Sequence, residues 1–200
     1  MRSSLATAAV LTMALLPAPP ATAASPATIK KAMLSFYWVI DESAPAYRGR
    51  AAEVALRDAR GHVIATTSRK FRRALVLEGA GRLRDGRVVT YNCKRRGEHR
   101  FRLTKAQSGL AVTGGALVPF RTVAVDPRVI KLGSKIYIPQ LKGAKLPDGT
   151  IHDGIFVAAD CGHFRGRHVD IFVGESPRGA RPFARRGYGS RSHVTVVVQP

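Results

Sequence analysis

The feature that most constrains this chain is a succession of short runs of β-branched and aromatic residues, separated by turns that contain glycine or proline. In the second half of the chain these runs are residues 122–125, 135–138, 154–159, 168–173 and 193–198. Runs of this length with turn residues between them predict the strands of an all-β sandwich or barrel. We find no amphipathic helical pattern of normal length, and expect only a turn or two of helix within residues 177–186. The predicted fold class is all-β.

The first half of the chain carries a similar signal. Residues 33–40 are rich in aromatic and β-branched residues and predict one strand. Residues 53–58 and 62–67 alternate apolar and polar side chains on either side of Arg60-Gly61, a pattern that indicates a β-hairpin.

A second pair of strands is predicted at residues 74–78 and 87–91, because glycine and aspartate residues suited to turns lie between them. The stretch from residue 91 to residue 107 is polar, basic and without clear periodicity. It predicts a loop or a short irregular connection.

The first residues predict export. Met1-Arg2 is followed by an apolar run over residues 5–16, a stretch broken by prolines, and the small-residue pattern Ala21-Thr22-Ala23. This is the pattern of a cleaved signal peptide, which we place at residues 1–23. A membrane-spanning helix needs about 20 consecutive apolar residues, which no segment supplies. We therefore expect a mature protein without a transmembrane segment, located in the periplasm or outside the cell.

The charge of the chain is strongly positive. There are 33 lysine and arginine residues against 13 aspartate and glutamate residues, a formal net charge of +20. Basic residues spread along a whole chain favour a polyanionic partner. Export favours an anionic polymer of the cell wall over nucleic acid. An exported nucleic-acid binder is an alternative, and so is a bias towards arginine that has no functional meaning.

The two cysteines, Cys93 and Cys161, permit one disulfide in an oxidising compartment, but the sequence does not show that they lie within bridging distance. A zinc site built from Asp160, Cys161, His163 and His168 matches no common ligand spacing. We therefore expect no metal and no cofactor.

Three aspartates lie at or inside predicted strands of the second half, namely Asp126, Asp160 and Asp170. Asp170 is flanked by Val169 and Ile171 in a run that otherwise predicts a buried strand. A carboxyl group there must be paired, hydrogen-bonded, or held neutral with a raised pKa, which is what a general acid needs. The other interpretation is that Asp170 faces outward on a half-exposed strand.

The aspartates belong to a pattern that resembles the bacterial three-aspartate (3D) domain. The motifs that carry the resemblance are Val123-Ala-Val-Asp-Pro127, Val157-Ala-Ala-Asp160 and Val169-Asp-Ile-Phe172, followed by His193-Val-Thr-Val196. The resemblance covers residues 110–198. It implies a double-psi β-barrel, as in the catalytic part of the A-type membrane-bound lytic transglycosylases. We place this barrel domain at residues 107–200 and a smaller β-rich segment at residues 24–106.

The resemblance also implies an activity. Lytic transglycosylases cleave the MurNAc-GlcNAc β-1,4 bond of peptidoglycan glycan strands and leave a 1,6-anhydro product. By motif, the acid/base role falls on Asp170, with Asp160 beside it and Asp126 in support. The residues expected to contact the glycan are Gly162, His163, Gly166 and Tyr137.

One segment departs from the family pattern. Relatives usually have Thr-Gly-Gly after the second aspartate, whereas this chain has Cys161-Gly162-His163 and one residue fewer before Asp170. A non-catalytic protein that binds the wall or acts as a scaffold is therefore an alternative. A glycoside hydrolase on the same barrel is another, and a partner carboxylate opposite Asp170 would favour it.

Overall fold

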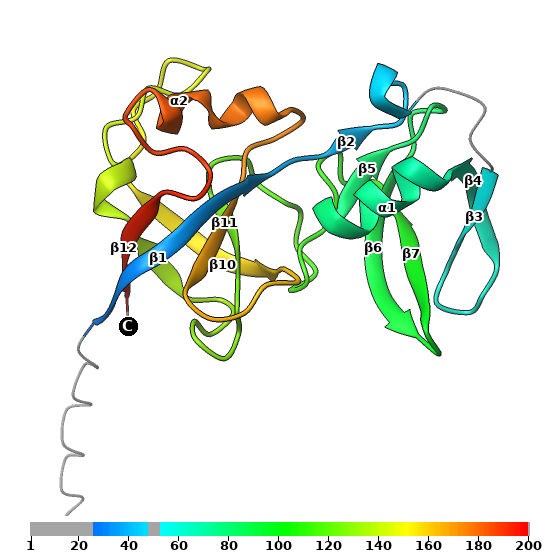
Figure 1. The fold of residues 1–200 in the computed structure, drawn as a ribbon, viewed down its shortest axis with the longest axis horizontal. Coiled ribbons are helices and arrows are strands. Elements are labelled where there is room, and N and C mark those ends of the chain that lie inside the picture. Colours follow the sequence, from blue (N-terminus) through cyan, green and yellow to red (C-terminus); the bar gives the residue numbers. More distant parts are fainter. Residues whose placement is uncertain (1–25, 48–52, 200) are drawn as a thin grey trace, which may run out of the picture.

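The computed structural model of the protein describes residues 26–47 and 53–199, which form two lobes that lie side by side (Figure 1). One lobe is a closed six-stranded barrel. The other, called here the small lobe (residues 40–47 and 53–104), holds a four-stranded sheet, a two-stranded hairpin and one helix. The predicted signal peptide lies outside the described residues. The protein is mostly β, as the sequence predicts.

The barrel is closed by strands in the order β1-β11-β8-β10-β9-β12. Their bounds are β1 Ala27–Tyr37, β8 Thr122–Val125, β9 Lys135–Tyr137, β10 Ile155–Cys161, β11 His168–Phe172 and β12 His193–Val198. The pairs β1–β11 and β8–β10 are parallel, and the other neighbours are antiparallel. The strands predicted in the second half are confirmed. The double-psi crossing of these strands stays a prediction.

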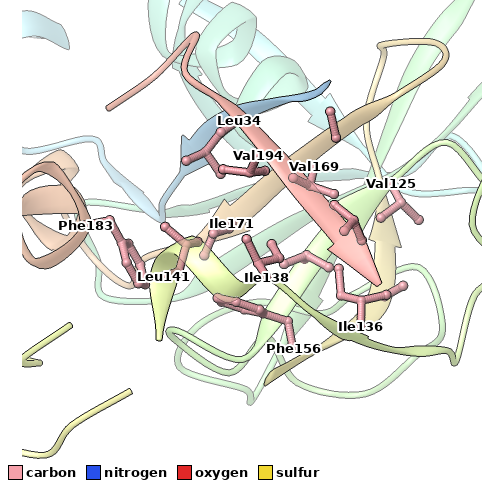
Figure 2. Packing of buried hydrophobic residues seen from close by; sticks show 14 of the residues in the cluster. Leu34, Val125, Ile136, Ile138, Leu141, Phe156, Val169, Ile171, Phe183 and Val194 are labelled. Carbon is pink, nitrogen blue, oxygen red and sulfur yellow. The ribbon is translucent and has the colours of Figure 1, made fainter. Parts of the chain in front are cut away.

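The interior of the barrel is filled by aliphatic and aromatic side chains from every strand (Figure 2). Ile136, Phe156 and Ile171 are each 0% exposed. Because successive residues of a strand point to opposite faces, these inward side chains force their neighbours onto the outer surface. Each fully buried side chain of this size contributes roughly 1.5–3 kcal/mol, so the core fixes which residues point outward.

Strand β1, at the start of the described chain, completes the barrel. It lies between β11 and β12, with Ser35 opposite Asp170 and Ala32 opposite Val194. The barrel therefore includes residues 27–37, which the predicted division at residue 106 assigned to the other segment. The chain then crosses from the barrel to the small lobe between β1 and β2 (Figure 1).

The small lobe is built around a sheet with the strand order β2-β5-β6-β7, beside a separate β3-β4 hairpin. The bounds are β2 Ile40–Asp41, β3 Glu53–Arg57, β4 Val63–Ser68, β5 Ala80–Arg82, β6 Val88–Arg95 and β7 Glu98–Thr104. The hairpin predicted around Arg60-Gly61 is confirmed, with Leu56 opposite Ala65.

The strand predicted at residues 74–78 is wrong, because this segment ends a helix, α1 (Arg69–Glu78). The Ser68 side chain accepts a hydrogen bond from the Phe71 amide and caps the start of the helix, and Gly79 ends it with a φ of 80°. Phe71 and Leu75 are four residues apart, so both lie on the face that packs against the sheet. The prediction considered only residues 74–78, the apolar last turns of α1, which resemble a short strand. The helical spacing that starts at Phe71 was therefore missed.

The loop predicted at residues 91–107 is also wrong, because β6 and β7 continue through it as one hairpin. The turn is Arg96-Gly97. Phe101 is 0% exposed and packs in the core of the small lobe, whereas its neighbours are polar. A strand that faces solvent on one side and buries a single large side chain has almost no hydrophobic periodicity in its sequence.

The short helices are the 3-10 turns η1 Pro45–Tyr47, η2 Pro139–Leu141 and η3 Pro177–Ala180, and the α-helix α2 Arg181–Ala184. The expected turn or two of helix within residues 177–186 is confirmed. Phe183 of α2 stacks on Phe36 at 5.8 Å and closes one part of the barrel core. Within residues 26–47 and 53–199, no helix has the length and apolar character needed to cross a membrane.

Candidate active site

A cavity of about 290 Å³ lies where the two lobes meet. The outer surface of the barrel contributes Tyr37, Ala124, Asp160 and Asp170 to its lining. The small lobe contributes the end of α1 and parts of β6 and β7, and the loop residues 110–112 complete the wall. The volume is at the lower end of the range for ligand pockets.

The alternation of β11 turns Asp170 towards this cavity. Val169 and Ile171 are both 0% exposed inside the barrel, so the residue between them points outward. On the outside it meets the cavity instead of open solvent. On β10, the register shifts between Ala158 and Asp160, and this irregularity brings the Asp160 carboxyl group to the same cavity.

The Asp170 carboxyl group lacks full hydrogen-bond support. Its Oδ1 atom is buried and has no hydrogen-bond partner among the described residues. Burial raises the pKa of Asp170 to about 6; the hydroxyl of Ser35 on the adjacent strand acts in the opposite direction, and the nearby Asp160 raises the pKa further. A carboxyl group with such a pKa can donate a proton and take one back near neutral pH.

Asp160, in contrast, is held by three donors. The Tyr37 hydroxyl donates to Oδ2 at 3.1 Å, and the amides of Val112 and Cys161 donate to Oδ1 at 3.1 and 2.9 Å. Burial raises the pKa of Asp160, and the three hydrogen bonds offset only part of that rise. All three bonds suit an ionised acceptor, so Asp160 is a positioned carboxylate beside Asp170.

A third carboxyl group of the cavity, Glu78, was not among the predicted site residues. It is the last residue of α1, and its Oε2 accepts a hydrogen bond from the Trp38 amide at 3.3 Å. Burial raises the pKa of Glu78 to about 7; the Trp38 amide lowers it, and the charge of Asp170 raises it. In the sequence, Glu78 ends the stretch 74–78 that was predicted as a strand, so nothing marked it as a site residue.

The rest of the small-lobe wall is aromatic, polar and basic. Tyr91 and Asn92 of β6 and Arg102 of β7 line the cavity there, and His163, from the loop between β10 and β11, lies beside them. The rings of Tyr91 and His163 lie 5.9 Å apart. The cavity therefore has carboxyl groups from the barrel and from α1, and one arginine from the β6-β7 hairpin.

Asp126 lies away from these groups and does not line the cavity. Its side chain is 1% exposed and forms two hydrogen bonds with Arg128, at 3.0 and 2.7 Å, while its Oδ2 also accepts the Gly166 amide at 2.8 Å. The Arg128 guanidinium, followed by the Gly166 amide, holds the pKa of Asp126 well below its usual range. Asp126 thus ties the end of β8 to the loop before β11.

The structure brings some of the predicted glycan contacts together and separates others. Gly162 and His163 line the cavity, whereas Gly166 and Tyr137 do not. Gly166 instead donates to Asp126, and Tyr137 pairs with Ile155 in the barrel. At Gly162 a side chain has no room, because a Cβ atom there would collide with the Phe164 ring.

The cysteines do not form a disulfide in this structure: Cys93 is half-buried, Cys161 is exposed, and both are free. Cys161 lines the cavity, where burial raises the pKa of its thiol and Asp160 adds to that rise. In the part of the chain that the structure describes, no group of three or more histidine, cysteine or acidic side chains is arranged to hold a metal ion.

Comparison with protein families identifies residues 121–198 as a 3D domain. The matched segment begins just before β8 and runs to the end of β12, so it contains Asp126, Asp160 and Asp170. No curated protein matches the chain in sequence. The resemblance inferred from the three aspartate motifs is therefore confirmed for the second half of the chain.

The fold of the whole described chain is similar to solved structures. A membrane-bound lytic murein transglycosylase from Agrobacterium tumefaciens matches with a TM-score of 0.58 and 17% identity, over 90% of this chain and 77% of the other. MltA from E. coli with bound chitohexaose matches with a TM-score of 0.55 and 14% identity, over 86% and 72%. At these identities the likeness shows a similar fold.

Proposed function

Since residues 121–198 are a 3D domain, we propose that the protein is a lytic transglycosylase that cleaves the MurNAc-GlcNAc β-1,4 bond of peptidoglycan. The observation that carries the proposal is Asp170: a half-buried carboxyl group with a pKa of about 6, aimed into a cavity between two lobes. The fold shared with two proteins named as lytic transglycosylases or solved with a chito-oligosaccharide supports it.

Asp170 serves both halves of the proposed reaction. The protonated carboxyl group gives its proton to the glycosidic oxygen as the bond from the muramyl anomeric carbon to that oxygen breaks. The resulting carboxylate then takes the proton of the C6 hydroxyl as that oxygen bonds to the same anomeric carbon. The product is a 1,6-anhydro sugar, no water is consumed, and Asp170 ends protonated as it began.

Asp160 and Tyr37 support this chemistry without reacting. The Asp160 carboxylate, fixed by Tyr37 and two backbone amides, favours the protonated form of Asp170 through like-charge repulsion. It also offers negative charge to the oxocarbenium-like sugar that forms as the bond breaks. Asp126 has a structural part in this proposal, because its hydrogen bonds join two loops outside the cavity.

The proposed location and partner follow from the activity. Peptidoglycan lies outside the cytoplasmic membrane, which agrees with a cleaved signal peptide at residues 1–23 and a protein in the periplasm or outside the cell. The net charge of +20 would hold the enzyme near the anionic polymers of the wall.

Glu78 gives a second candidate function its support. A hydrolase of the inverting kind uses one carboxyl group as acid and another as base for water, on the two sides of the scissile bond. Glu78 and Asp170 line the same cavity from different lobes, and each has a raised pKa. That arrangement would suit a hydrolase that releases reducing ends.

The test is mass spectrometry of purified peptidoglycan after incubation with the protein and with Asp170→Ala. Anhydro-muropeptides from the wild type alone are expected. Products with reducing ends would replace the proposal with the hydrolase. Retained wall binding without any product would replace it with a scaffold protein, the reading that the Cys161-Gly162-His163 segment suits.

A further inference from the structure

We infer that Ser35 and His168 are positioning residues for Asp170: the His168 imidazole donates a hydrogen bond to the Ser35 hydroxyl and thereby turns that hydroxyl towards the Asp170 carboxyl group. We call Ser35 and His168 the relay. This inference rests on the proposed function and deepens it, because it names the groups that support Asp170 once its proton has been given away. Neither residue lines the cavity, so both act on the reaction through Asp170.

The alternation of two neighbouring strands places these side chains together. On β1, Leu34 and Phe36 point into the barrel core, so Ser35 lies on the outer surface. On β11, the same alternation puts His168 and Asp170 two residues apart on that surface. Because β1 and β11 are parallel neighbours, with Ser35 opposite Asp170, the serine hydroxyl meets both side chains.

The Ser35 hydroxyl stands between two hydrogen-bonding partners. Its Oγ atom lies 2.6 Å from Nε2 of His168. Its hydrogen bond to the carboxyl group of Asp170 lowers the pKa of that group. A hydroxyl has a single proton, so it donates to one of these partners and accepts from the other. The direction of the relay therefore depends on which ring nitrogen of His168 carries a proton.

The environment of His168 favours a neutral ring with its proton on Nε2. Burial lowers the pKa of His168, and the ring of Phe164 stacks on the imidazole with 3.9 Å between the centroids. The Nδ1 atom is buried and has no hydrogen-bond partner among the described residues. A buried N–H group without an acceptor is rarer than an unpaired acceptor, which assigns the proton to Nε2. Ser35 then accepts from His168 and donates its own proton to Asp170.

The segment that departs from the family pattern contributes to the relay. Gly162 has no side chain at the place that the Phe164 ring occupies, and a Cβ atom there would collide with that ring. The glycine therefore leaves room for Phe164 to stack on His168.

The relay matters because other groups around Asp170 oppose its charged form. Burial and the negative charge of Asp160 raise the pKa of Asp170, and Glu78 and Asp170 repel each other when both are charged. The Ser35 hydroxyl favours the carboxylate, so Asp170 can release its proton and take one back. The other titratable or charged side chains that line the cavity are Tyr37, Tyr91, Arg102, Cys161 and His163.

The test measures the pKa of Asp170 by an NMR titration of the isotope-labelled aspartate carboxyl groups in the folded protein. Asp170→Asn identifies the resonance, because it removes that signal. The measurement needs no glycan, so it does not depend on the proposed function. The release of anhydro-muropeptides by the same proteins is followed in parallel by mass spectrometry.

Three variants interrupt the relay: Ser35→Ala, His168→Phe, and the two combined. His168→Phe keeps a ring that can stack on Phe164. If it does not fold, His168→Asn takes its place, because the shorter amide does not reach the Nε2 position. Ser35→Thr and His168→Gln keep a donor at each position and so separate hydrogen bonding from packing. The matched control is His193→Phe, which replaces an exposed histidine of β12, on the other side of β1.

Ser35→Ala should bind the Asp170 proton about ten-fold more tightly, the size of one hydrogen bond to a charged group. His168→Phe should give part of this change, about three-fold, and the double variant no more than Ser35→Ala alone, because His168 acts through Ser35. Ser35→Thr, His168→Gln and His193→Phe should stay within about two-fold of the wild type.

An unchanged pKa of Asp170 in Ser35→Ala or in His168→Phe would overturn the inference, and so would a double variant in which the two changes add. These outcomes leave the proposed function standing. The expected pKa changes in a protein that releases no anhydro-muropeptides would keep the relay and overturn the proposed function.

Discussion

Two regions of the barrel carry aspartates from the same set of motifs and treat them in opposite ways. In the cavity, Asp170 has a buried oxygen without a partner, and its pKa is raised to about 6. At the Asp126 corner, which we define as Asp126, Arg128 and Gly166, the carboxyl group is bound by a guanidinium and two backbone amides, and its pKa is lowered.

The difference shows that the motif places a carboxyl group but its neighbours decide what that group can do. A guanidinium and amide donors favour the charged form, so Asp126 is a fixed structural anion. Burial without enough donors favours the neutral form, so Asp170 can hold a proton to donate. Glu78 lies outside the motifs, and its environment resembles that of Asp170: burial raises its pKa as well.

The largest expected effect comes from replacing the two aspartates in parallel. Asp170→Asn should lower the release of anhydro-muropeptides about a thousand-fold, because a general acid contributes that order of rate enhancement. Asp126→Asn should keep its turnover within a few-fold but lower the melting temperature by several degrees, since it loses the ion pair with Arg128 and weakens the hydrogen bond from the Gly166 amide, which ties the end of β8 to the loop before β11. Equal losses of turnover in both variants, with both still folded, would contradict the division into a reacting Asp170 and a structural Asp126.

The next effect concerns stability and pH. The pKa of Asp170 is raised from 3.8 to about 6, so the folded state binds its proton more tightly and loses stability as pH rises through that window. Relative to the wild type, Asp170→Asn should therefore gain about 3 kcal/mol of unfolding free energy between pH 4 and pH 8.

Urea unfolding of both proteins across this pH range measures the gain. Asp126→Asn serves as the opposite control, because a lowered pKa stabilises the folded state above the ordinary value of the group. Its deficit against the wild type should shrink as pH falls below 4. A gap between Asp170→Asn and the wild type that does not change with pH would show that Asp170 titrates normally.

A smaller effect is expected for Glu78→Gln. If Asp170 alone acts as acid and base, Glu78 shapes the charge of the cavity, and the variant should lose about ten-fold or less in turnover. The released products should remain anhydro-muropeptides. A loss as large as that of Asp170→Asn, together with reducing ends among the wild-type products, would show that the two residues act as a hydrolase pair.

The smallest effect is a shift in the pH profile. In wild type, kcat/KM should decline as pH rises through about 6, because the proton donor is lost. Asp160→Asn removes the like charge that raises the pKa of Asp170, so the decline should move to lower pH. A shift to higher pH, or no shift, would show that the charge of Asp160 does not raise the pKa of Asp170.

The sequence predicted the barrel better than the small lobe. The barrel strands are recognisable in the sequence because they are buried on one face and separated by turns. The strand predicted at residues 168–173, for example, is β11 (His168–Phe172). In the small lobe, α1 was missed since only its end was apolar enough to notice, and β7 was missed since Phe101 is its one buried anchor.

The same contrast holds for the site. The sequence singled out Asp126, Asp160 and Asp170 by their places at or in predicted strands and by the resemblance to the 3D domain. The cavity brings Asp160 and Asp170 together and leaves Asp126 out. Glu78 and Arg102 were not found, because a glutamate at a helix end and an arginine in a basic stretch are ordinary residues. They gain meaning only from the distant residues that the fold places around them.

By itself, the sequence determined the class of the fold and the barrel strands from residue 122 onward, because alternation within a strand is a local property, and its motifs singled out three aspartates. Only the tertiary structure decided that β1 closes the barrel, that Asp126 forms an ion pair with Arg128, and that the small lobe adds Glu78 and Arg102 to the cavity. Burial and charge pairing depend on residues far apart in the chain, and that is why the protonation of Asp170 is a property of the folded protein.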